Sequence, residues 1–341
     1  MAEPAASRVG VLGAGSWGTT LALHLARKGE TVTLWDGDAA HVARLEAEGR
    51  NERHVPGEKF PPSITVTPWL EDACGGPVVI FAVPAAAMTP VAESVAKAHP
   101  EWAGLPVTVA KGFEGESGRR MSQVLAGALP AAASRRVVAL AGPSLAREVA
   151  GGLPVTLVAA GPEAEAREVQ ALFSGRNMRV YTNPDIAGVE YAGALKNIIA
   201  IAAGILDGMG LGDNARGALI TRGLAEMVRL GTALGSRAES FYGLCGVGDL
   251  VTTCSSRLSR NHQVGERLAG GQKLEAILQE LGQVAEGVPA ARAAVDLARR
   301  AGVEMPIAQQ VHEVLFSGKD PRRALDELMS RGLKPEVNAT R

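Results

Sequence analysis

The residue with the most unusual setting is Lys196, which lies in an otherwise apolar, small-sided stretch from residue 190 to residue 207. A helix is expected there, because apolar residues recur at the spacing of one helical face: Tyr191, Leu195, Ile198, Ile199 and Ala202. A lysine in such surroundings costs free energy unless another group pairs with it. The alternative is a helix-edge lysine that reaches solvent. We interpret Lys196 as a proton donor and acceptor, or as an anion ligand, at a closed site.

Two polar turns in the N-terminal half could contribute to the same site. Lys111 follows a predicted strand at 107–110, and Gly142 and Ser144 follow another at 137–140. The carboxyl ends of parallel strands line one crevice, so these turns are expected to meet there. A role in a binding site explains Lys111 at least as well as a role as a surface cation does. Gly142 and Ser144 are the weaker case, because turns use these residues for their own sake.

Ser259, Arg260 and Asn261 are candidates for binding a phosphate group. Arginine presents a planar fork of donors, and the serine hydroxyl and asparagine amide add further donors. The same three residues would also suit the capped start of a helix, with Arg260 in solvent. Their spacing alone does not separate the two interpretations.

A nucleotide-binding motif begins at residue 13. Gly13, Gly15 and Gly18 form the pattern G-x-G-x-x-G between a predicted strand at 8–12 and a predicted helix at 19–28. In that context the glycines permit a tight turn, a close approach to a pyrophosphate and close packing of helix on strand. The pyrophosphate would lie on the N-terminus of the helix.

These candidate residues require an α/β fold whose sheet is in the N-terminal part. Further strands are expected at 31–35, 64–67, 78–83 and 155–159, with helices such as 89–98 and 118–129 between strands. This alternation predicts a doubly wound, Rossmann-like, mostly parallel sheet. We expect a dinucleotide-binding domain at 1–187.

Strand signals fade after residue 188, and an all-helical domain at 188–341 is expected to carry the substrate and catalytic residues. Helices are predicted at 215–234, 274–281, 289–301, 307–316 and 321–330. Two glycine-rich stretches, 208–217 and 243–248, are predicted to be loops.

Composition limits the classes of function. The formal net charge is -1, and aromatic residues make up 4% of the chain, so a nucleic-acid partner is not expected. Lys196 interrupts the best apolar run, so no membrane insertion is expected. The three cysteines, Cys74, Cys245 and Cys254, lack metal-ligand spacing, which indicates no metal and fits a reducing cytoplasm.

Taken together, the motifs resemble those of bacterial NAD(P)-dependent glycerol-3-phosphate dehydrogenases. The matching segments are Gly13-Ala-Gly-Ser-Trp-Gly18, Lys111-Gly112, Gly142-Pro-Ser-Leu-Ala-Arg-Glu148, Gly193-Ala-Leu-Lys-Asn197, Asn214-Ala-Arg216, Thr221-Arg-Gly-Leu-Ala-Glu226, Gly248-Asp-Leu250, Ser259-Arg-Asn261 and Val284-Ala-Glu-Gly287. The nucleotide motif is shared by many families. The lysine–asparagine helix followed by Ser-Arg-Asn is specific to this one.

The resemblance implies a reaction and a role for each matching residue. Dihydroxyacetone phosphate and sn-glycerol 3-phosphate would be interconverted with NAD(H) or NADP(H), for phospholipid synthesis, by a cytoplasmic enzyme that is often a homodimer. Lys196 would give the proton to the ketone oxygen. The other implied substrate ligands are Lys111, Gly142, Ser144, Asp249, Ser259, Arg260 and Asn261. The implied cofactor ligands, besides the three motif glycines, are Ser16, Trp17, Lys111, Ala146, Arg260, Val284 and Glu286.

Two other functions remain open from the residues. A two-domain hydroxy-acid dehydrogenase would keep the nucleotide fold and Lys196, but would leave Ser259, Arg260 and Asn261 without a special role. A nucleotide-sensing protein without turnover would need only the N-terminal domain, and would leave Lys196 and Lys111 unexplained.

The cofactor preference rests on Asp36, where the chain departs from the family it resembles. Many bacterial members carry arginine or histidine just after the tryptophan that ends the second strand, whereas this chain has Trp35-Asp-Gly-Asp38. An acidic residue there typically accepts hydrogen bonds from the ribose of NADH and repels the 2′-phosphate of NADPH. Arg44, Arg50 or Arg53 could supply the missing cation instead. We predict that NADH is used at least as well as NADPH.

Overall fold

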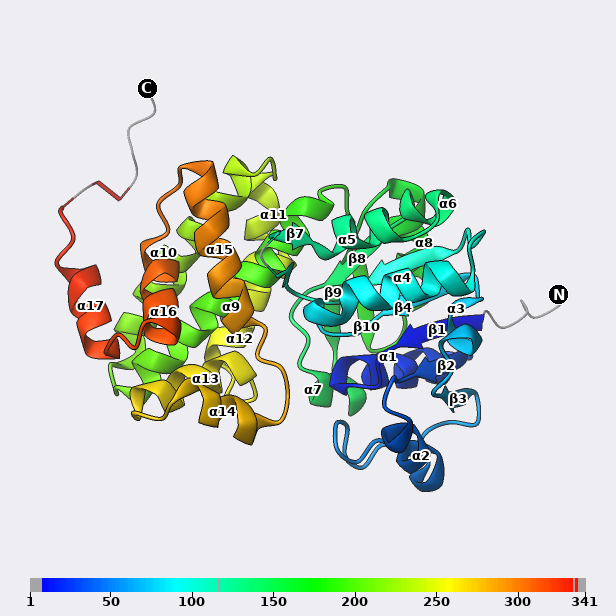
Figure 1. Ribbon diagram of the computed structural model, residues 1–341. Coiled ribbons are helices and arrows are strands. Elements are labelled where there is room, and N and C mark those ends of the chain that lie inside the picture. Colours follow the sequence, from blue (N-terminus) through cyan, green and yellow to red (C-terminus); the bar gives the residue numbers. More distant parts are fainter. Residues whose placement is uncertain (1–7, 116, 334, 337–341) are drawn as a thin grey trace.

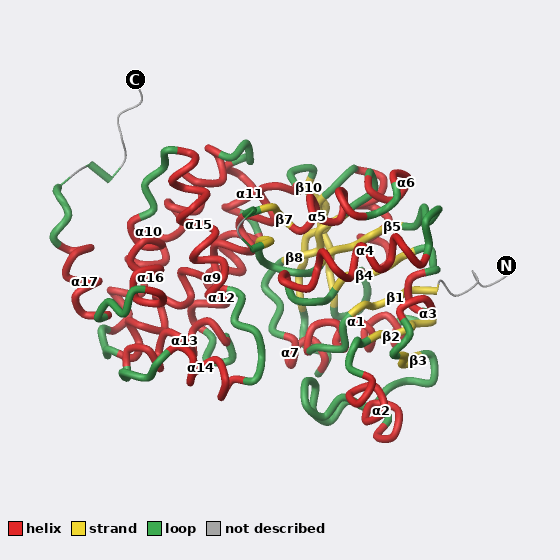
Figure 2. The backbone as a smooth tube through the Cα atoms, viewed as in Figure 1, coloured by secondary structure: helices red, strands yellow, loops and turns green. Residues whose placement is uncertain are grey.

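The computed structural model describes residues 8–115, 117–333 and 335–336, which form a sheet-containing half and a helical half (Figure 1). All strands lie in the first half, as the tube view shows (Figure 2). They are β1 (Arg8–Leu12), β2 (Thr31–Trp35), β3 (Ile64–Thr67), β4 (Val78–Phe81), β5 (Leu105–Thr108), β6 (Phe113–Glu114), β7 (Arg119–Arg120), β8 (Val138–Ala141), β9 (Val155–Ala160) and β10 (Met178–Asn183).

Eight of these strands form one sheet in the order β10-β9-β8-β5-β4-β1-β2-β3. Every neighbouring pair in it is parallel except β8 with β9. The predicted doubly wound, mostly parallel sheet is therefore confirmed. The edge strand β10 was missed, because Arg179, Thr182 and Asn183 break the apolar pattern that marks a buried strand.

Helices cover both faces of the sheet. One face packs against α1 (Ser16–Arg27), α2 (Ala39–Glu48), α7 (Ala146–Ala150) and α8 (Glu163–Phe173). The other packs against α3 (Leu70–Cys74), a short 3₁₀ helix (Ala85–Ala87), α4 (Met88–Ala98), α5 (Met121–Ala128) and α6 (Ala131–Ser134). In β4, Val78 and Ile80 join the first core while Val79 and Phe81 join the second, as the two-residue period of a strand requires.

One predicted helix in this half is shorter than expected. Residues 118–120 do not start the helix predicted at 118–129, because β6 and β7 pair as a small antiparallel hairpin. Arg119 donates from its guanidinium to the carboxylate of Glu114 across that hairpin, with Nε and Oε2 2.7 Å apart. This cross-strand pair favours the hairpin over another turn of helix.

The helical half is built around α9 (Ile186–Gly208), which lies at its centre in Figure 1. Around it are α10 (Gly212–Ala233), α11 (Ala238–Tyr242), a π-helix (Leu244–Gly248), α12 (Asp249–Ser255), α13 (Arg260–Ala269), α14 (Leu274–Leu281), α15 (Gly287–Ala301), α16 (Pro306–Phe316) and α17 (Pro321–Met329). Among the described residues, α9 alone is long and apolar enough to cross a membrane, and its apolar window is 100% buried inside the protein.

Both predicted glycine loops are wrong in part. Residues 208–217 are mostly helical: α9 continues to Gly208 and α10 begins at Gly212, with only a short turn between the two helices. Gly208 serves close packing instead, since a Cβ there would lie 2.7 Å from the carbonyl oxygen of Glu266 on α13. The stretch 243–248 contains the π-helix, a rare form that often occurs at functional sites.

The change from sheet to helices occurs near the predicted domain boundary. The last strand ends at Asn183 and α9 begins at Ile186, just before residue 188. Asp185 caps α9 by accepting from the backbone N–H of Gly188 at 2.9 Å. The division into domains at 1–187 and 188–341 stays a prediction.

Candidate active site

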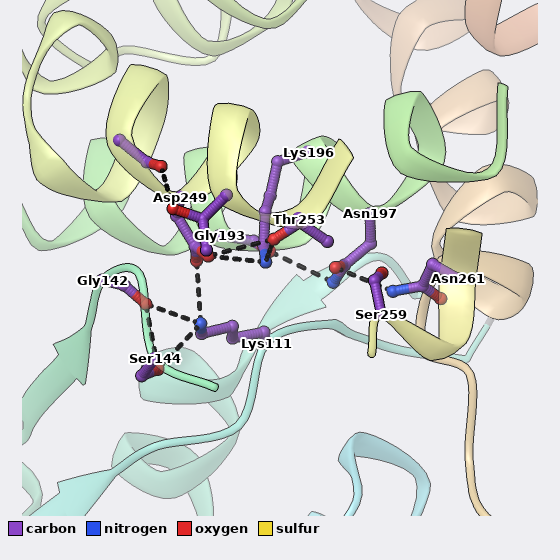
Figure 3. A network of polar contacts seen from close by, with 12 residues as sticks. Lys111, Gly142, Ser144, Gly193, Lys196, Asn197, Asp249, Thr253, Ser259 and Asn261 are labelled. Atoms are coloured by element: carbon purple, nitrogen blue, oxygen red, sulfur yellow. Dashed lines mark hydrogen bonds and ion pairs between the residues drawn. The ribbon is translucent and has the colours of Figure 1, made fainter. Parts of the chain in front are cut away.

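Lys196 is buried at the centre of a polar cluster within the helical half (Figure 3). Its side chain is 5% exposed, and its Nζ donates to Oδ1 of Asp249 at 2.8 Å and to the hydroxyl of Thr253. Thr253 Oγ1 donates in turn to Asp249 Oδ1 at 3.1 Å. Lys196 is therefore not a helix-edge lysine that reaches solvent, and that alternative is wrong.

Lys111 reaches the same carboxylate from the sheet half. Its Nζ lies 2.8 Å from Asp249 Oδ2, 2.9 Å from the carbonyl oxygen of Gly142 and 3.5 Å from Ser144 Oγ. Gly142 has φ +143°, and a Cβ there would lie 3.0 Å from the carbonyl oxygen of Thr156, so this turn needs glycine. The turns that follow β5 and β8 thus meet as predicted, although β5 ends at Thr108, two residues earlier than expected.

The two ammonium groups and the carboxylate shift one another's pKa. Burial lowers the pKa of Lys196 to about 8, with the charge of Asp249 opposing the shift and that of Lys111 adding to it. Burial alone would raise the pKa of Asp249, but the charges and hydrogen bonds of Lys111 and Lys196 outweigh it and hold that pKa below its ordinary value. A lysine with a pKa close to neutrality can both give and take a proton.

The cluster has one positive charge in excess and one unused donor. Two of the three N–H groups of Lys196 bind Asp249 and Thr253, and no third acceptor occurs among the described residues. Gly193, one turn before Lys196, faces the Lys111 side chain, whose Cγ would lie 3.7 Å from a Cβ added at this glycine. Such a site can stabilise an oxygen that gains negative charge and then deliver a proton to it.

Asn261 connects this cluster to two further helices. Its Nδ2 donates to Asn197 Oδ1 at 2.9 Å, next to Lys196, and its Oδ1 accepts from the backbone N–H of Gly287 at 2.9 Å. Ser259 caps α13 by accepting from the N–H of His262 at 3.3 Å, so the capped-start interpretation is confirmed for this residue. Arg260 follows as the first residue of the helix.

Arg260 itself has a different environment from its neighbours. Its side chain is exposed, and no ion pair within the described part of the chain includes it. The protein around it still removes enough water to lower the pKa of Arg260, and the charge of Glu286 opposes that shift. A free guanidinium beside the unpaired N–H groups of a helix N-terminus is an arrangement that binds anions.

The loop before α1 fits a dinucleotide. Gly13 has φ +113°, and a Cβ there would lie 2.8 Å from the carbonyl oxygen of Ala82. At Gly18 a Cβ would lie 1.9 Å from the carbonyl oxygen of Gly13, so helix and loop touch. At Gly15, in contrast, a Cβ would meet nothing within 4 Å. This open side, at the uncapped N-terminus of a 12-residue helix, leaves room for a pyrophosphate.

The other predicted cofactor residues lie in two places. Ser16 and Trp17 open α1, and Ala146 is joined to that helix because its carbonyl oxygen accepts from Thr20 Oγ1 at 3.2 Å. Glu286 lies across from them, and its Oε1 accepts from the N–H of Ala85, beyond β4, at 3.3 Å. Val284 is 43% exposed in the same loop as Glu286. Within the described part of the chain, no hydrogen bond or ion pair joins these residues directly to the lysine cluster.

Asp36 is held against the glycine loop. Its Oδ2 accepts from the N–H of Ala14 at 3.0 Å, and its Oδ1 accepts from the N–H of Asp38 at 3.0 Å. The same loop is held from the other side by Asn51, whose Nδ2 donates to the carbonyl oxygen of Ala14 at 2.8 Å. Asp36 therefore lies where the ribose next to a bound pyrophosphate would be expected.

Sequence reasoning brought most of the lysine cluster together but missed Thr253. The spacing could have indicated this residue, because Thr253 is four residues after Asp249 and so lies on the same face of α12. Asn197 was noted only as part of a motif, yet it joins Lys196 to Asn261. The bond between Glu286 and the N–H of Ala85 depends on the packing of the two halves, which no local pattern encodes.

Comparison with known proteins agrees with this arrangement. Residues 8–167 match the family model described as NAD-dependent glycerol-3-phosphate dehydrogenase N-terminus, and residues 185–326 match the corresponding C-terminus. Proteins named glycerol-3-phosphate dehydrogenase [NAD(P)+] from Chlorobium limicola and Geobacter sulfurreducens are each 49% identical over 331 residues. These alignments cover 96% of this chain and 99% and 98% of the relatives.

A solved structure extends the similarity to the whole fold. The glycerol-3-phosphate dehydrogenase of Coxiella burnetii superposes with a TM-score of 0.91 at 38% identity, over 96% of this chain and 100% of that one. Both halves match in sequence, and the full architecture matches in space. The chain therefore belongs to the NAD-dependent glycerol-3-phosphate dehydrogenase family.

Proposed function

We propose that Lys196 is the general acid in the reduction of dihydroxyacetone phosphate to sn-glycerol 3-phosphate, and the general base in the reverse reaction. The observation that carries this role is the buried ammonium with two N–H groups fixed by Asp249 and Thr253 and a third without an acceptor among the described residues. As a member of its family, the chain is an NAD(P)-dependent oxidoreductase.

The chain's own residues align the substrate and control its charge. A bound reduced nicotinamide supplies the hydride, and Gly13, Gly15 and Gly18 would hold its pyrophosphate. Arg260 and the N-terminus of α13 would bind the substrate phosphate, with the second amide hydrogen of Asn261 available to it. The ketone would then lie between this anion site and Lys196.

As the carbonyl oxygen gains negative charge, Lys196 stabilises it and transfers a proton to it. Lys111 adds a second positive charge on the far side of Asp249. Asp249 keeps both lysines in place, because each of its oxygens accepts from one of them. Gly142 and Ser144 hold Lys111 in turn, so we assign them to the substrate side of the site.

The cofactor-binding role extends to residues that face the glycine loop. Ser16 and Trp17 open the helix that follows that loop, and Ala146 bonds to the same helix. Glu286 accepts from the N–H of Ala85 after β4, and its charge acts on Arg260. We assign these residues, together with Lys111 and Val284, to the cofactor, as the resemblance of the motifs around the dinucleotide-binding loop implies.

The decisive experiment follows the absorbance of the reduced nicotinamide with purified protein. Oxidation of NADH or NADPH is expected with dihydroxyacetone phosphate and at a much lower rate with unphosphorylated dihydroxyacetone or a small 2-oxo acid. Equal rates with the unphosphorylated ketones would favour a hydroxy-acid dehydrogenase. Cofactor binding without turnover on any of them would favour a nucleotide-sensing protein.

The cellular setting is a further part of the proposal. The product supports synthesis of glycerophospholipids, and we place the enzyme in the cytoplasm because its three cysteines are free and buried. We also propose a homodimer, as is common among such enzymes. Light scattering coupled to size-exclusion chromatography tests this, since a monomer mass of 35.3 kDa would contradict it.

A further inference from the structure

The helix that carries the phosphate-binding residues rests directly on α9. A Cβ at Gly204 of α9 would lie 2.0 Å from the carbonyl oxygen of His262, and a Cβ at Gly265 of α13 would lie 2.0 Å from that of Ile201. The two backbones therefore touch without intervening side chains. Such packing firmly sets how far apart the two helices lie. It restrains the sliding of one helix along the axis of the other less firmly.

A polar contact at the start of α13 supplies the missing axial constraint. His262 Nε2 lies 2.7 Å from Asp207 Oδ2, and the histidine side chain is only 3% exposed. Asp207 is itself held by Arg216 of α10, whose Nη2 lies 2.6 Å and whose Nε lies 3.2 Å from the other carboxylate oxygen. Three helices thus meet at one aspartate near the C-terminus of α9.

The position of His262 links this contact to the proposed phosphate site. Arg260 and Asn261 directly precede it, and Asn261 makes two hydrogen bonds of 2.9 Å that depend on where α13 lies along α9. A displacement of about 1 Å is enough to misalign groups that bind a reacting molecule. Among the described residues, the His262 side chain hydrogen-bonds to Asp207 and to none of the residues assigned to the substrate.

We propose that His262, anchored by Asp207 and Arg216, is a positioning residue that sets the phosphate-binding geometry of Arg260 and Asn261. This inference rests on the proposed function, in which these two residues bind the substrate phosphate. A histidine that only fills the core would affect stability and all substrates alike. A positioning residue affects the phosphorylated substrate selectively.

The test compares His262→Leu, which removes the hydrogen bond, with His262→Gln, which keeps a donor at a similar distance. In His262→Leu the KM for dihydroxyacetone phosphate should rise roughly tenfold while kcat changes less than about threefold. The KM for the nicotinamide cofactor and the kcat/KM for unphosphorylated dihydroxyacetone should be unchanged. His262→Gln should restore most of the affinity.

Two further variants keep the test decisive. If His262→Leu does not fold, Asp207→Asn removes the same anchor from the other side and should raise the same KM. Asp213→Asn is the matched control, because Asp213 also pairs with Arg216 at 2.7 Å but its side chain is 91% exposed. It should leave every constant near its native value.

The outcomes separate this inference from the proposed function. Arg260→Lys is measured in parallel. If it raises the KM for dihydroxyacetone phosphate while folded His262→Leu and Asp207→Asn leave it unchanged, the positioning role is overturned. If none of these variants changes the KM, the phosphate site itself is overturned. Equal losses with phosphorylated and unphosphorylated substrate in His262→Leu would also overturn the positioning role.

Discussion

Two buried charged clusters join α9 to the sheet half, and they differ in how their charges are matched. In the first, Glu190 accepts from Arg120 Nη1 at 2.5 Å, from the N–H of Ser122 at 2.7 Å and from the hydroxyl of Ser122. In the second, Lys196 and Lys111 share the single carboxylate of Asp249. Lys196 is only six positions after Glu190 on the same helix.

The first cluster is balanced and the second is not. One glutamate faces one arginine, and Arg120 and Ser122 occupy three of the roughly four acceptor positions of the carboxylate, so no net charge is left for another molecule. Two lysines around one aspartate leave one positive charge in excess and an N–H group without a described acceptor. Burial of charge alone therefore does not identify a reactive site. Between these two clusters, the unmatched charge is what distinguishes the candidate active site.

The largest effect is expected when the balanced cluster is broken. Glu190→Ala leaves Arg120, whose side chain is only 13% exposed, without its charged partner and should lower the free energy of unfolding by about 3–5 kcal/mol. The folded fraction should keep kcat within about threefold of native, because Glu190 does not touch the reacting atoms. Urea unfolding and active-site-normalised kinetics measure the two quantities.

The control for this variant is an exposed pair. Glu163→Ala removes the partner of Arg167, where both side chains are at least 70% exposed, and should cost less than about 0.5 kcal/mol. If Glu190→Ala is as stable as this control, the first cluster is not a structural clamp. If kcat falls by more than the loss of folded protein explains, Glu190 takes part in catalysis.

In the second, unbalanced cluster, the expected effect of a substitution is on catalysis. Lys196→Ala should bind the cofactor nearly normally but lose at least about a hundredfold in kcat, because the developing oxyanion has no proton donor. Cofactor fluorescence titration and steady-state kinetics provide the two measurements. A near-native kcat would show that the proton comes from another group.

The same lysine should give the reaction a defined pH dependence. Because Lys196 must carry its proton to act as an acid, reduction should be fastest below its pKa of about 8 and fall about tenfold per pH unit above it. The reverse oxidation needs the neutral amine, so its rate should rise through the same range. Profiles of kcat in both directions test this, and parallel profiles would contradict the assignment.

Arg260 extends the comparison to a charge that has no ion-pair partner among the described residues. Arg260→Lys keeps the charge but removes the planar fork, so the KM for dihydroxyacetone phosphate should rise up to about tenfold, with less change in kcat. An unchanged KM would return Arg260 to the role of a solvated surface residue.

How far the sequence predicts this molecule depends on whether the signal is local. The apolar run around Lys196 and the turn at Gly13 to Gly18 each specify their own structure, and both were predicted with their elements. The Glu190 clamp was not predicted, since its partners Arg120 and Ser122 lie about 70 residues earlier. Nothing near Glu190 in the chain marks it as paired.

The same distinction explains the errors in the fold. Glycines at 204, 208, 246 and 265 pack backbone against backbone, and sequence reasoning has no way to tell this use from a turn. The predicted loop at 208–217 is wrong in part for that reason, since Gly208 packs against α13 and only residues 209–211 form a turn. Asp249 was singled out only through the resemblance, although its partners Lys111 and Lys196 were both singled out from their surroundings.

Asp36 gives the smallest expected effect and the sharpest test of the comparison, because it combines features of both clusters. Like Glu190, it has hydrogen bonds to both of its oxygens, from the N–H groups of Ala14 and Asp38. Like Lys196, it belongs to a site that we propose binds a ligand. A carboxylate has about four acceptor positions, so two remain for ribose hydroxyls.

We predict that NADH is used at least as well as NADPH, because a fixed carboxylate at this position repels a 2′-phosphate. Asp36→Ala would also leave the N–H of Ala14 without its acceptor, so kcat/KM should fall for both cofactors. The informative quantity is therefore their ratio, which should move toward NADPH by about fivefold in Asp36→Asn, where one oxygen can still hold Ala14. Exposed Arg53 lies on the loop beside His54, where its charge and that of Arg260 act on the histidine, and could bind a 2′-phosphate instead. Our prediction would be contradicted by a strong native preference for NADPH that neither Asp36 substitution changes but that Arg53→Ala abolishes. Such a result would show that cations from this loop select the cofactor. Asp36, like Glu190, would then only hold the structure together.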